Sequence, residues 1–255
     1  TSATAASSGA DLNGKAAQAA ARKIKARLTA FAAAHFDTAE EAVEFRDNQV
    51  FIDGHPMPFK ELINMAYVNR ISLSATGFYK TPKIHWDRDA AKGRPFYYFA
   101  YGAAVTEVII NTLTGEYTFL RTDILHDAGR SLNPAIDIGQ IEGGYVQGTG
   151  WLTSEELWWN DKGELKTHAP STYKIPTGRD IPNDMRVSLY EGDNVEESIH
   201  RSKAVGEPPL MLGISSFLAI RDAIAATSDD PSTVPPLQAP ATPEAVLKAI
   251  EALQS

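Results

Sequence analysis

Cysteine is absent from the 255 residues of the sequence, and this absence excludes several kinds of site. Without thiolates the chain can hold neither a disulfide nor an iron–sulfur cluster, and it cannot form a zinc site built on thiolate ligands. If the function needs a redox centre of this kind, that centre must lie on another polypeptide.

Familiar signatures of hydrolytic and nucleotide-binding sites are missing as well. The sequence has no GxxxxGK[ST] loop, no HExxH pair, no EF-hand loop and no GxSxG elbow, and its six histidines are scattered. P-loop chemistry and hydrolytic zinc chemistry are therefore disfavoured.

Positive charge is scarce, because 24 lysines and arginines face 32 acidic residues for a net charge of -8. Such a balance gives no general attraction to nucleic acid or to anionic lipid surfaces. The longest largely apolar stretch, residues 210–220, is interrupted by Gly213 and two serines and is too short to cross a bilayer. We expect neither nucleic acid nor a membrane as a partner, and we expect a cytoplasmic location.

The overall composition is that of a globular protein. Hydrophobic residues make up 43% and charged residues 22%, so a sizeable core can form. The length fits one domain over residues 1–255, with a possible division into two lobes at about 1–130 and 131–255.

Periodicity and turn signals predict mixed secondary structure. Asp11 is a candidate N-cap for the first helix, Gly115 marks the turn of a hairpin, and Thr242 with Pro243 starts the last helix. We expect helices over residues 11–35, 59–69, 138–157, 208–226 and from 242 onward, and strands over residues 96–111, 116–125 and 186–190. Strands and helices do not alternate regularly, so we predict an α+β fold with mixed sheet segments and helices.

Two of these helices carry further expectations. The first has basic residues between Lys15 and Arg27 beside an apolar stripe, which we interpret as the solvated face of a core-facing helix and not as a transit peptide. Apolar residues nearly surround the helix predicted over residues 208–226, so we expect it to be buried.

A glycine-rich run between Gly139 and Gly150 permits two interpretations. A dinucleotide-binding turn would need GxGxxG spacing directly after a strand, and neither condition is met. Glycines that let helices pack closely explain the run better.

The segment Ser202-Lys-Ala-Val-Gly-Glu-Pro-Pro-Leu210 contains the most informative acid, Glu207. Gly206 precedes it, and a proline pair that restricts the backbone follows it at the start of a helix. Glu207 could simply complement the helix dipole in the first turn, or it could be a rigidly held general base. The chain features alone favour the first interpretation.

This segment closely resembles a motif of the xanthine dehydrogenase and aldehyde oxidase family of molybdenum hydroxylases. Five other strings resemble the same family in the right order: TAASS with DLN from Thr4, RISLSATGFYKTP from Arg70, LRTDIL from Leu120, SLNPAIDIGQ from Ser131 and PSTYKIP from Pro170. The resemblance covers nearly the whole chain up to the last helix. It implies the C-terminal half of a molybdopterin-binding domain.

The resemblance also implies site residues. Glu207 matches the general base, and Ala6 matches a residue whose backbone lies next to molybdenum without providing a side-chain ligand. Ser7, Ser8 and Gly9 match backbone that surrounds the pterin and its phosphate, Gln140 matches a side chain that bonds the pterin, and Gly206 allows close approach. For His126 and Asp127 we expect no chemistry, only ordinary satisfied polar groups.

The implied reaction is hydroxylation of a purine, xanthine or hypoxanthine to urate, with water as oxygen source. Electrons would pass through [2Fe-2S] clusters and FAD on other segments or subunits to NAD. The family's substrate-clamping arginine and sandwiching phenylalanines have no match here, so we expect partners: the preceding half of the molybdenum subunit and an iron–sulfur and FAD subunit, the whole assembly forming a dimer. Alternatives are an aldehyde oxidase, another N-heterocycle hydroxylase, or a non-catalytic scaffold that binds the cofactor.

Overall fold

The computed structural model describes residues 7–230 and 232–254. By its internal contacts the chain divides into two compact units, Thr1–Tyr97 and Tyr98–Ser255. We expected a possible division near residue 130, but the observed one falls well before it. The elements on either side of residue 130 pack together in the second unit.

The first unit begins with a π-helical turn, η1 (Gly9–Gly14), which leads directly into helix α1 (Lys15–His35). Asp11 lies inside η1, so its prediction as an N-cap was wrong. The helical hydrogen bonding already includes Ser8, whose carbonyl oxygen accepts a bond from the backbone nitrogen of Leu12 at 2.9 Å.

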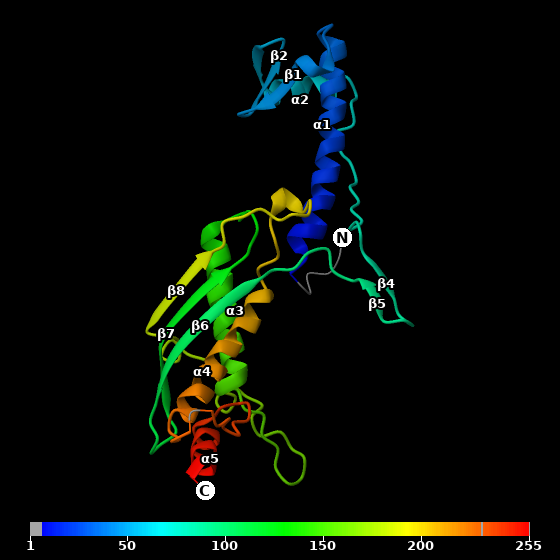
Figure 1. Ribbon diagram of the computed structural model, residues 1–255. Helices are drawn as coiled ribbons and strands as arrows, with labels where there is room; N and C mark the ends of the chain where they lie inside the picture. Colours follow the sequence, from blue (N-terminus) through cyan, green and yellow to red (C-terminus); the bar gives the residue numbers. More distant parts are fainter. Residues whose placement is uncertain (1–6, 231, 255) are drawn as a thin grey trace. The chain divides into compact units, whose positions relative to one another are not determined.

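A three-stranded antiparallel sheet that we did not predict follows α1. Its turns centre on Asp47-Asn48 and Asp53-Gly54, and all four residues have positive φ, as hairpin turns of two residues require. Helix α2 comes next, and it packs with α1 and the sheet around one apolar core (Figure 1). The elements are η2 (Glu40–Ala42), β1 (Val43–Arg46), β2 (Gln49–Ile52), β3 (His55–Pro58) and α2 (Phe59–Val68).

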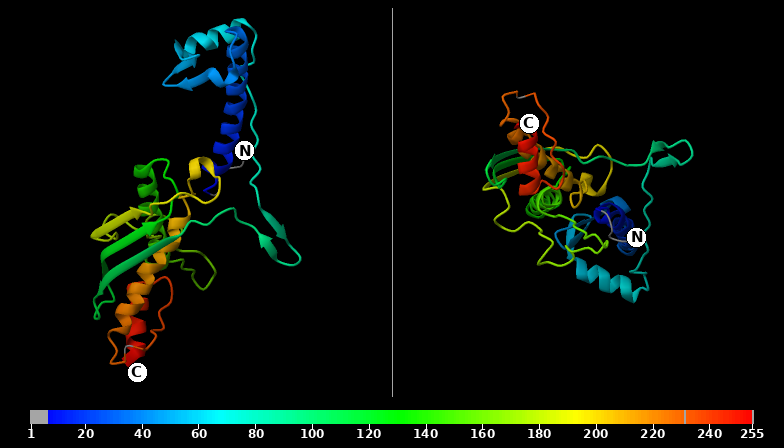
Figure 2. Two further views of the ribbon diagram at one scale, coloured as in Figure 1. Left: turned by 45° about the horizontal axis from the view of Figure 1, so that its top comes forward. Right: turned by 90° about the horizontal axis from the view of Figure 1, so that it is seen from below.

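The segment after α2 runs beside α1 without regular secondary structure. Lys23 donates to the carbonyl oxygen of Thr76 at 2.9 Å, and Arg27 donates to those of Ser72 and Ser74 at 3.1 and 2.7 Å. We had expected the basic residues of α1 to be solvated. Two of them, Lys23 and Arg27, instead donate hydrogen bonds to this segment. A two-stranded ribbon, β4 (His85–Asp87) with β5 (Lys92–Arg94), completes the unit (Figure 2).

The second unit contains a mixed three-stranded sheet. Strands β6 (Gly102–Ile110) and β7 (Tyr117–His126) form the predicted hairpin, and Gly115 adopts a φ of 73° in its turn. Strand β8 (Asp184–Leu189) pairs with β7 in parallel, after a crossover that includes helix α3. This arrangement confirms the α+β prediction.

Helices α3 and α4 cover one face of this sheet (Figure 1). Helix α3 begins earlier than predicted because Asn133 caps it and Pro134 occupies its first turn. The last helix begins at Pro243 as expected, and the Thr242 hydroxyl accepts a hydrogen bond from the backbone nitrogen of Ala245 at 3.3 Å. The helical elements are α3 (Pro134–Thr153), η3 (Ile199–Arg201), η4 (Pro208–Gly213), α4 (Ile214–Ala225) and α5 (Pro243–Gln254).

The segment predicted as one buried helix is a 3₁₀-helix, η4, followed by α4. Only one side is buried, and Met211, Ile214 and Leu218 are 59%, 45% and 42% exposed. The prediction of full burial was wrong, because apolar character does not show which side of a helix has a partner. By length and composition Pro208–Ala225 could also cross a membrane, a property shared by core helices of soluble proteins.

A network of buried hydroxyl groups joins both helices to the sheet. The hydroxyl of Tyr145 on α3 lies 3.0 Å from Thr106, 2.8 Å from Thr122 and 2.7 Å from Ser216. Since Tyr145 is fully buried, these contacts replace the water that its hydroxyl loses on folding. They fix α3 and α4 relative to β6 and β7.

Candidate functional site

Glu207 occupies the N-cap position of η4, directly before Pro208 and Pro209. Its carbonyl oxygen accepts a hydrogen bond from the backbone nitrogen of Leu210 at 3.1 Å. The carboxylate makes no capping bond to η4, and the side chain is exposed. A rigid backbone therefore presents a carboxylate that is not used to hold the helix together.

The glycines of α3 form the surface on which η4 packs. A Cβ atom on Gly144 would lie 3.0 Å from the Pro209 side chain, and one on Gly213 would lie 2.5 Å from the backbone of Gly148. A larger residue at position 213 would overlap the backbone of α3, and one at position 144 would require Pro209 to shift. The interpretation of the glycine run as a packing surface is confirmed for Gly144 and Gly148. Because the run lies inside a helix, it does not form a dinucleotide-binding turn.

The chain before Glu207 is also fixed. Val205 is buried in a core cluster with residues of β7 and α3. The backbone nitrogen of Lys203 donates to the carbonyl oxygen of Ala128 at 2.7 Å, and Ser202 forms a β-bridge with Gly129. Glu207 is thus held from both sides by backbone packing.

Gln140 lies on α3, one turn before Gly144, and its side chain is exposed. Nothing lies within 4 Å of a Cβ placed on its neighbour Gly139 or on Gly143. Since Gly144 contacts Pro209, the structure brings together the helical elements that carry Gln140 and Glu207. Gly206 is exposed beside Glu207.

The remaining predicted site residues belong to the first unit. Ser7, Ser8 and Gly9 lead into η1 and are partly buried, and nothing lies within 4 Å of a Cβ placed on Gly9. Ala6 lies outside the described residues. The backbone nitrogens at the start of a helix lack internal partners, so the turn at Ser8 suits an anionic group such as a phosphate.

His126 departs from the expectation of a satisfied polar residue. It is 1% exposed, and neither ring nitrogen has a hydrogen-bond partner. Burial lowers the pKa of the imidazole below its ordinary value of 6.5; Asp127 opposes the shift and Lys203 adds to it. The ring is therefore neutral near pH 7. Asp127, in contrast, is satisfied by Lys203 and by the backbone of Gly129.

The side chains present fit a metal that is held through a pterin. Within residues 7–230 and 232–254, no group of three His, Asp or Glu side chains could hold a metal ion. The site offers one exposed carboxylate, one exposed amide and small residues next to open space. Such groups can bind an organic cofactor whose own sulfur atoms supply the metal ligands.

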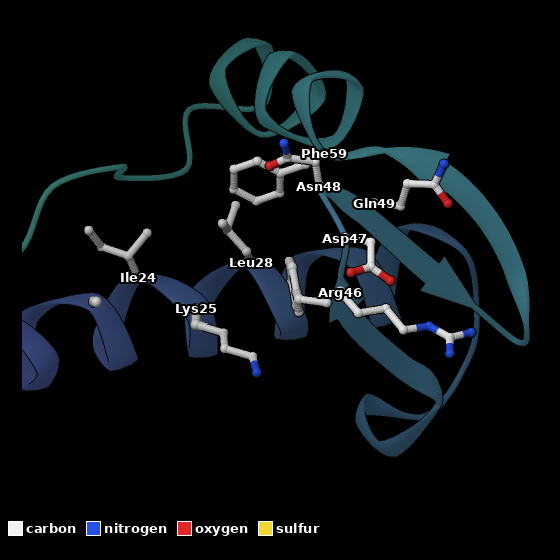
Figure 3. Close-up of a pocket in the computed structure, with 10 residues that line it drawn as sticks. Ile24, Lys25, Leu28, Arg46, Asp47, Asn48, Gln49 and Phe59 are labelled. Atoms are coloured by element: carbon white, nitrogen blue, oxygen red, sulfur yellow. The ribbon is translucent and has the colours of Figure 1, made fainter. Parts of the chain in front are cut away.

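Two pockets lie away from these residues. One, of about 420 Å³, lies in the first unit between α1 and the sheet (Figure 3). Its lining includes the apolar Leu28 and Phe59 and the charged Lys25, Arg46 and Asp47. The other, of about 400 Å³, lies in the second unit beside Tyr173. Neither contains a predicted site residue.

Comparison with known proteins assigns the chain to a family of cofactor-binding domains. Residues 1–182 match the family model of the molybdopterin cofactor-binding domain. The chain therefore belongs to this family of molybdenum-cofactor domains.

Its sequence relatives include xanthine dehydrogenases, the proteins whose motifs the sequence resembles. It is 45% identical over 254 residues to the xanthine dehydrogenase/oxidase of Rattus norvegicus, an alignment that covers 98% of this chain and 18% of that protein. The chain thus spans less than a fifth of the length of this relative.

Solved structures agree on the fold. A Cu,Mo-CO dehydrogenase superimposes with a TM-score of 0.75 at 24% identity, covering 95% of this chain and 29% of the other. Quinoline 2-oxidoreductase from Pseudomonas putida gives 0.73 at 25% identity, covering 91% and 28%. The mixed sheet and helices are thus those of a molybdopterin-binding domain.

Proposed function

We propose that this chain is the C-terminal part of the molybdenum-cofactor domain of a xanthine dehydrogenase-type hydroxylase, and that Glu207 is its general base. The supporting observation is the carboxylate itself, which is exposed, free of helix-capping bonds and carried on a backbone fixed by prolines and by packing on α3. The 45% identity to a xanthine dehydrogenase/oxidase supports a purine, xanthine or hypoxanthine, as substrate.

Each residue then has a definite task. The bound molybdenum–pterin group would supply the oxygen that is transferred and would accept the electrons of the substrate C–H bond. Glu207 takes up the proton released in this step on a carboxylate oxygen. Gln140 would donate to the pterin from α3, Gly206 would leave room for its approach, and the backbone of Ser7, Ser8 and Gly9 would hold its phosphate. Ala6 is proposed from the motif resemblance alone.

The rest of the electron path lies outside the chain, which has no cysteine. We infer that [2Fe-2S] clusters and FAD on other segments or subunits carry electrons to NAD. The partners would be the preceding half of the molybdenum subunit and the iron–sulfur and FAD subunit, in a cytoplasmic assembly that dimerises.

The test is Glu207→Gln in the assembled protein, with Glu251→Gln as control, because Glu251 is also exposed but lies on the last helix, α5, outside the motif. General-base assistance is typically worth about 10²–10⁴-fold, so we expect turnover to fall by that factor while molybdenum content stays unchanged. Wild-type turnover in Glu207→Gln would refute the proposal. An intact wild-type assembly without molybdenum would indicate a scaffold.

A second candidate reaction is hydroxylation of another N-heterocycle or of an aldehyde. It is supported by the likeness to quinoline 2-oxidoreductase. Steady-state assays of the assembly with xanthine, hypoxanthine, quinoline and an aromatic aldehyde distinguish these reactions. A higher kcat/KM for quinoline or the aldehyde than for both purines would favour the second candidate.

A further inference from the structure

Lys203 and Asp127 form a largely buried ion pair in the second unit. The Nζ atom of Lys203 lies 2.5 Å from Oδ2 of Asp127, and the two side chains are 8% and 16% exposed. The same ammonium donates to the carbonyl oxygen of Phe99 at 2.9 Å and lies 5.4 Å from the centre of the Tyr101 ring. Its positive charge is thus surrounded by three favourable groups.

The partner carboxylate is fixed in turn. Oδ1 of Asp127 accepts a hydrogen bond from the backbone nitrogen of Gly129 at 2.8 Å. Gly129 has a φ of 59°, and a Cβ on it would lie 2.5 Å from the carbonyl oxygen of Arg201, so the loop after β7 lies directly against the segment before Glu207. Asp127 therefore binds the loop after β7 through one carboxylate oxygen and Lys203 of this segment through the other.

Lys203 also lies within a row of backbone anchors. The backbone nitrogen of the next residue, Ala204, donates to the Tyr98 hydroxyl at 2.8 Å. The carbonyl oxygen of Ser202 accepts bonds from the side chains of Asn194 and Ser198 at 3.1 and 2.5 Å. Beyond Val205, however, Gly206 and Glu207 are exposed. The Lys203–Asp127 ion pair is thus the last contact between charged groups that fixes the chain before Glu207.

From these contacts we propose that Lys203 and Asp127 are positioning residues that set the location of the Glu207 carboxylate. This inference rests on the proposed role of Glu207. A buried pair of charges costs desolvation energy, and well-packed apolar groups in its place often stabilise a protein equally well. A pair that specifies one backbone arrangement is useful where a carboxylate must meet a reacting atom, because a shift of about 1 Å can cost about 10²-fold in rate.

The test uses Lys203→Met, Lys203→Arg and the control Lys248→Met in the assembled protein. Lys248 makes an exposed ion pair with Glu244, so the same substitution there removes a charge away from the site. For Lys203→Met we expect kcat to fall at least about 10-fold, with KM and molybdenum content unchanged. Hydrogen exchange should become faster at the backbone of residues 202–206. Lys203→Arg keeps the charge and should restore part of kcat.

The outcomes separate the positioning role of Lys203 and Asp127 from the proposed role of Glu207 as general base. If Lys203→Met keeps wild-type kcat, or if it loses kcat together with molybdenum, the pair does not position Glu207 and the inference is overturned. Should Lys203→Met prove too unstable to assemble, Asp127→Asn replaces it, with the same expected and overturning results. If Glu207→Gln retains turnover, the proposed function itself fails, whatever the Lys203 variants do.

Discussion

A Cβ atom placed on Gly148 of α3 would lie 2.0 Å from the carbonyl oxygen of Leu210 in η4. Real side chains do not approach a backbone oxygen this closely, so the helix and the segment after Glu207 are in contact only because residue 148 is glycine. The packing of one helix thereby determines where the acid lies.

Gly148→Ala is therefore expected to force η4 away from α3. Overpacking of this kind costs about 1–3 kcal/mol, and a displacement of Glu207 by about 1 Å would lower turnover by about 10²-fold. Gly143→Ala is the matched control, because nothing lies within 4 Å of its Cβ and alanine favours a helix interior. Thermal unfolding of the assembled proteins compares the stability of the two variants. Equal unfolding midpoints for Gly148→Ala and wild type would show that the position of η4 does not depend on this contact.

His126 predicts a dependence of stability on pH. Burial lowers its pKa below 6.5 in the folded protein, so the unfolded chain binds more protons in the interval between the two pKa values. Stability should fall as the pH decreases below about 6.5. His126→Met should remove this part of the dependence and be at least as stable near pH 7, since the imidazole has no hydrogen bond to lose.

The control for this prediction is His168→Gln, because His168 is exposed. Midpoints of denaturant unfolding between about pH 5 and pH 7.5 cover the relevant range. An identical pH dependence in wild type and His126→Met would contradict the assignment of a neutral, unpartnered imidazole.

Tyr145→Phe tests the buried hydroxyl network. The substitution removes one hydroxyl and takes one hydrogen-bond partner from each of Thr106, Thr122 and Ser216. Thr106 and Thr122 keep their bond to each other, and Ser216 keeps its bond to Thr149. We expect a loss of about 1–3 kcal/mol in the free energy of unfolding. Tyr190→Phe, at a residue 54% exposed, should change it little. A loss of the same small size in both variants would mean that the network does not stabilise the fold.

Much of the fold could be predicted where local chemistry decides the structure. Gly115, between two segments rich in β-branched residues, correctly predicted the β6–β7 hairpin. Thr242 with Pro243 correctly predicted the start of α5. The sheet of β1 to β3 was missed because each strand has only four residues. The Asp53-Gly54 pair was a usable signal, since it is a typical two-residue hairpin turn.

Interactions between distant segments were harder to predict. The charge of Lys203 is visible in the sequence, but its partner Asp127 lies 76 residues away, and only the pairing of the loop after β7 with the segment before Glu207 brings them together. Likewise, nothing in the apolar pattern of α4 indicated which side would remain exposed. Gly144 and Gly148 of α3 could be interpreted correctly because η4 packs closely on them, whereas Gly139 and Gly143 face open space.

The most direct test of the account is a map of the assembled, molybdenum-loaded protein. We predict that a carboxylate oxygen of Glu207 lies about 2.6–3.2 Å from the oxygen atom to be transferred, or one water molecule away from it, with Gln140 in contact with the pterin. A map in which another residue occupies this position and Glu207 points to solvent, away from the cofactor, would contradict the account.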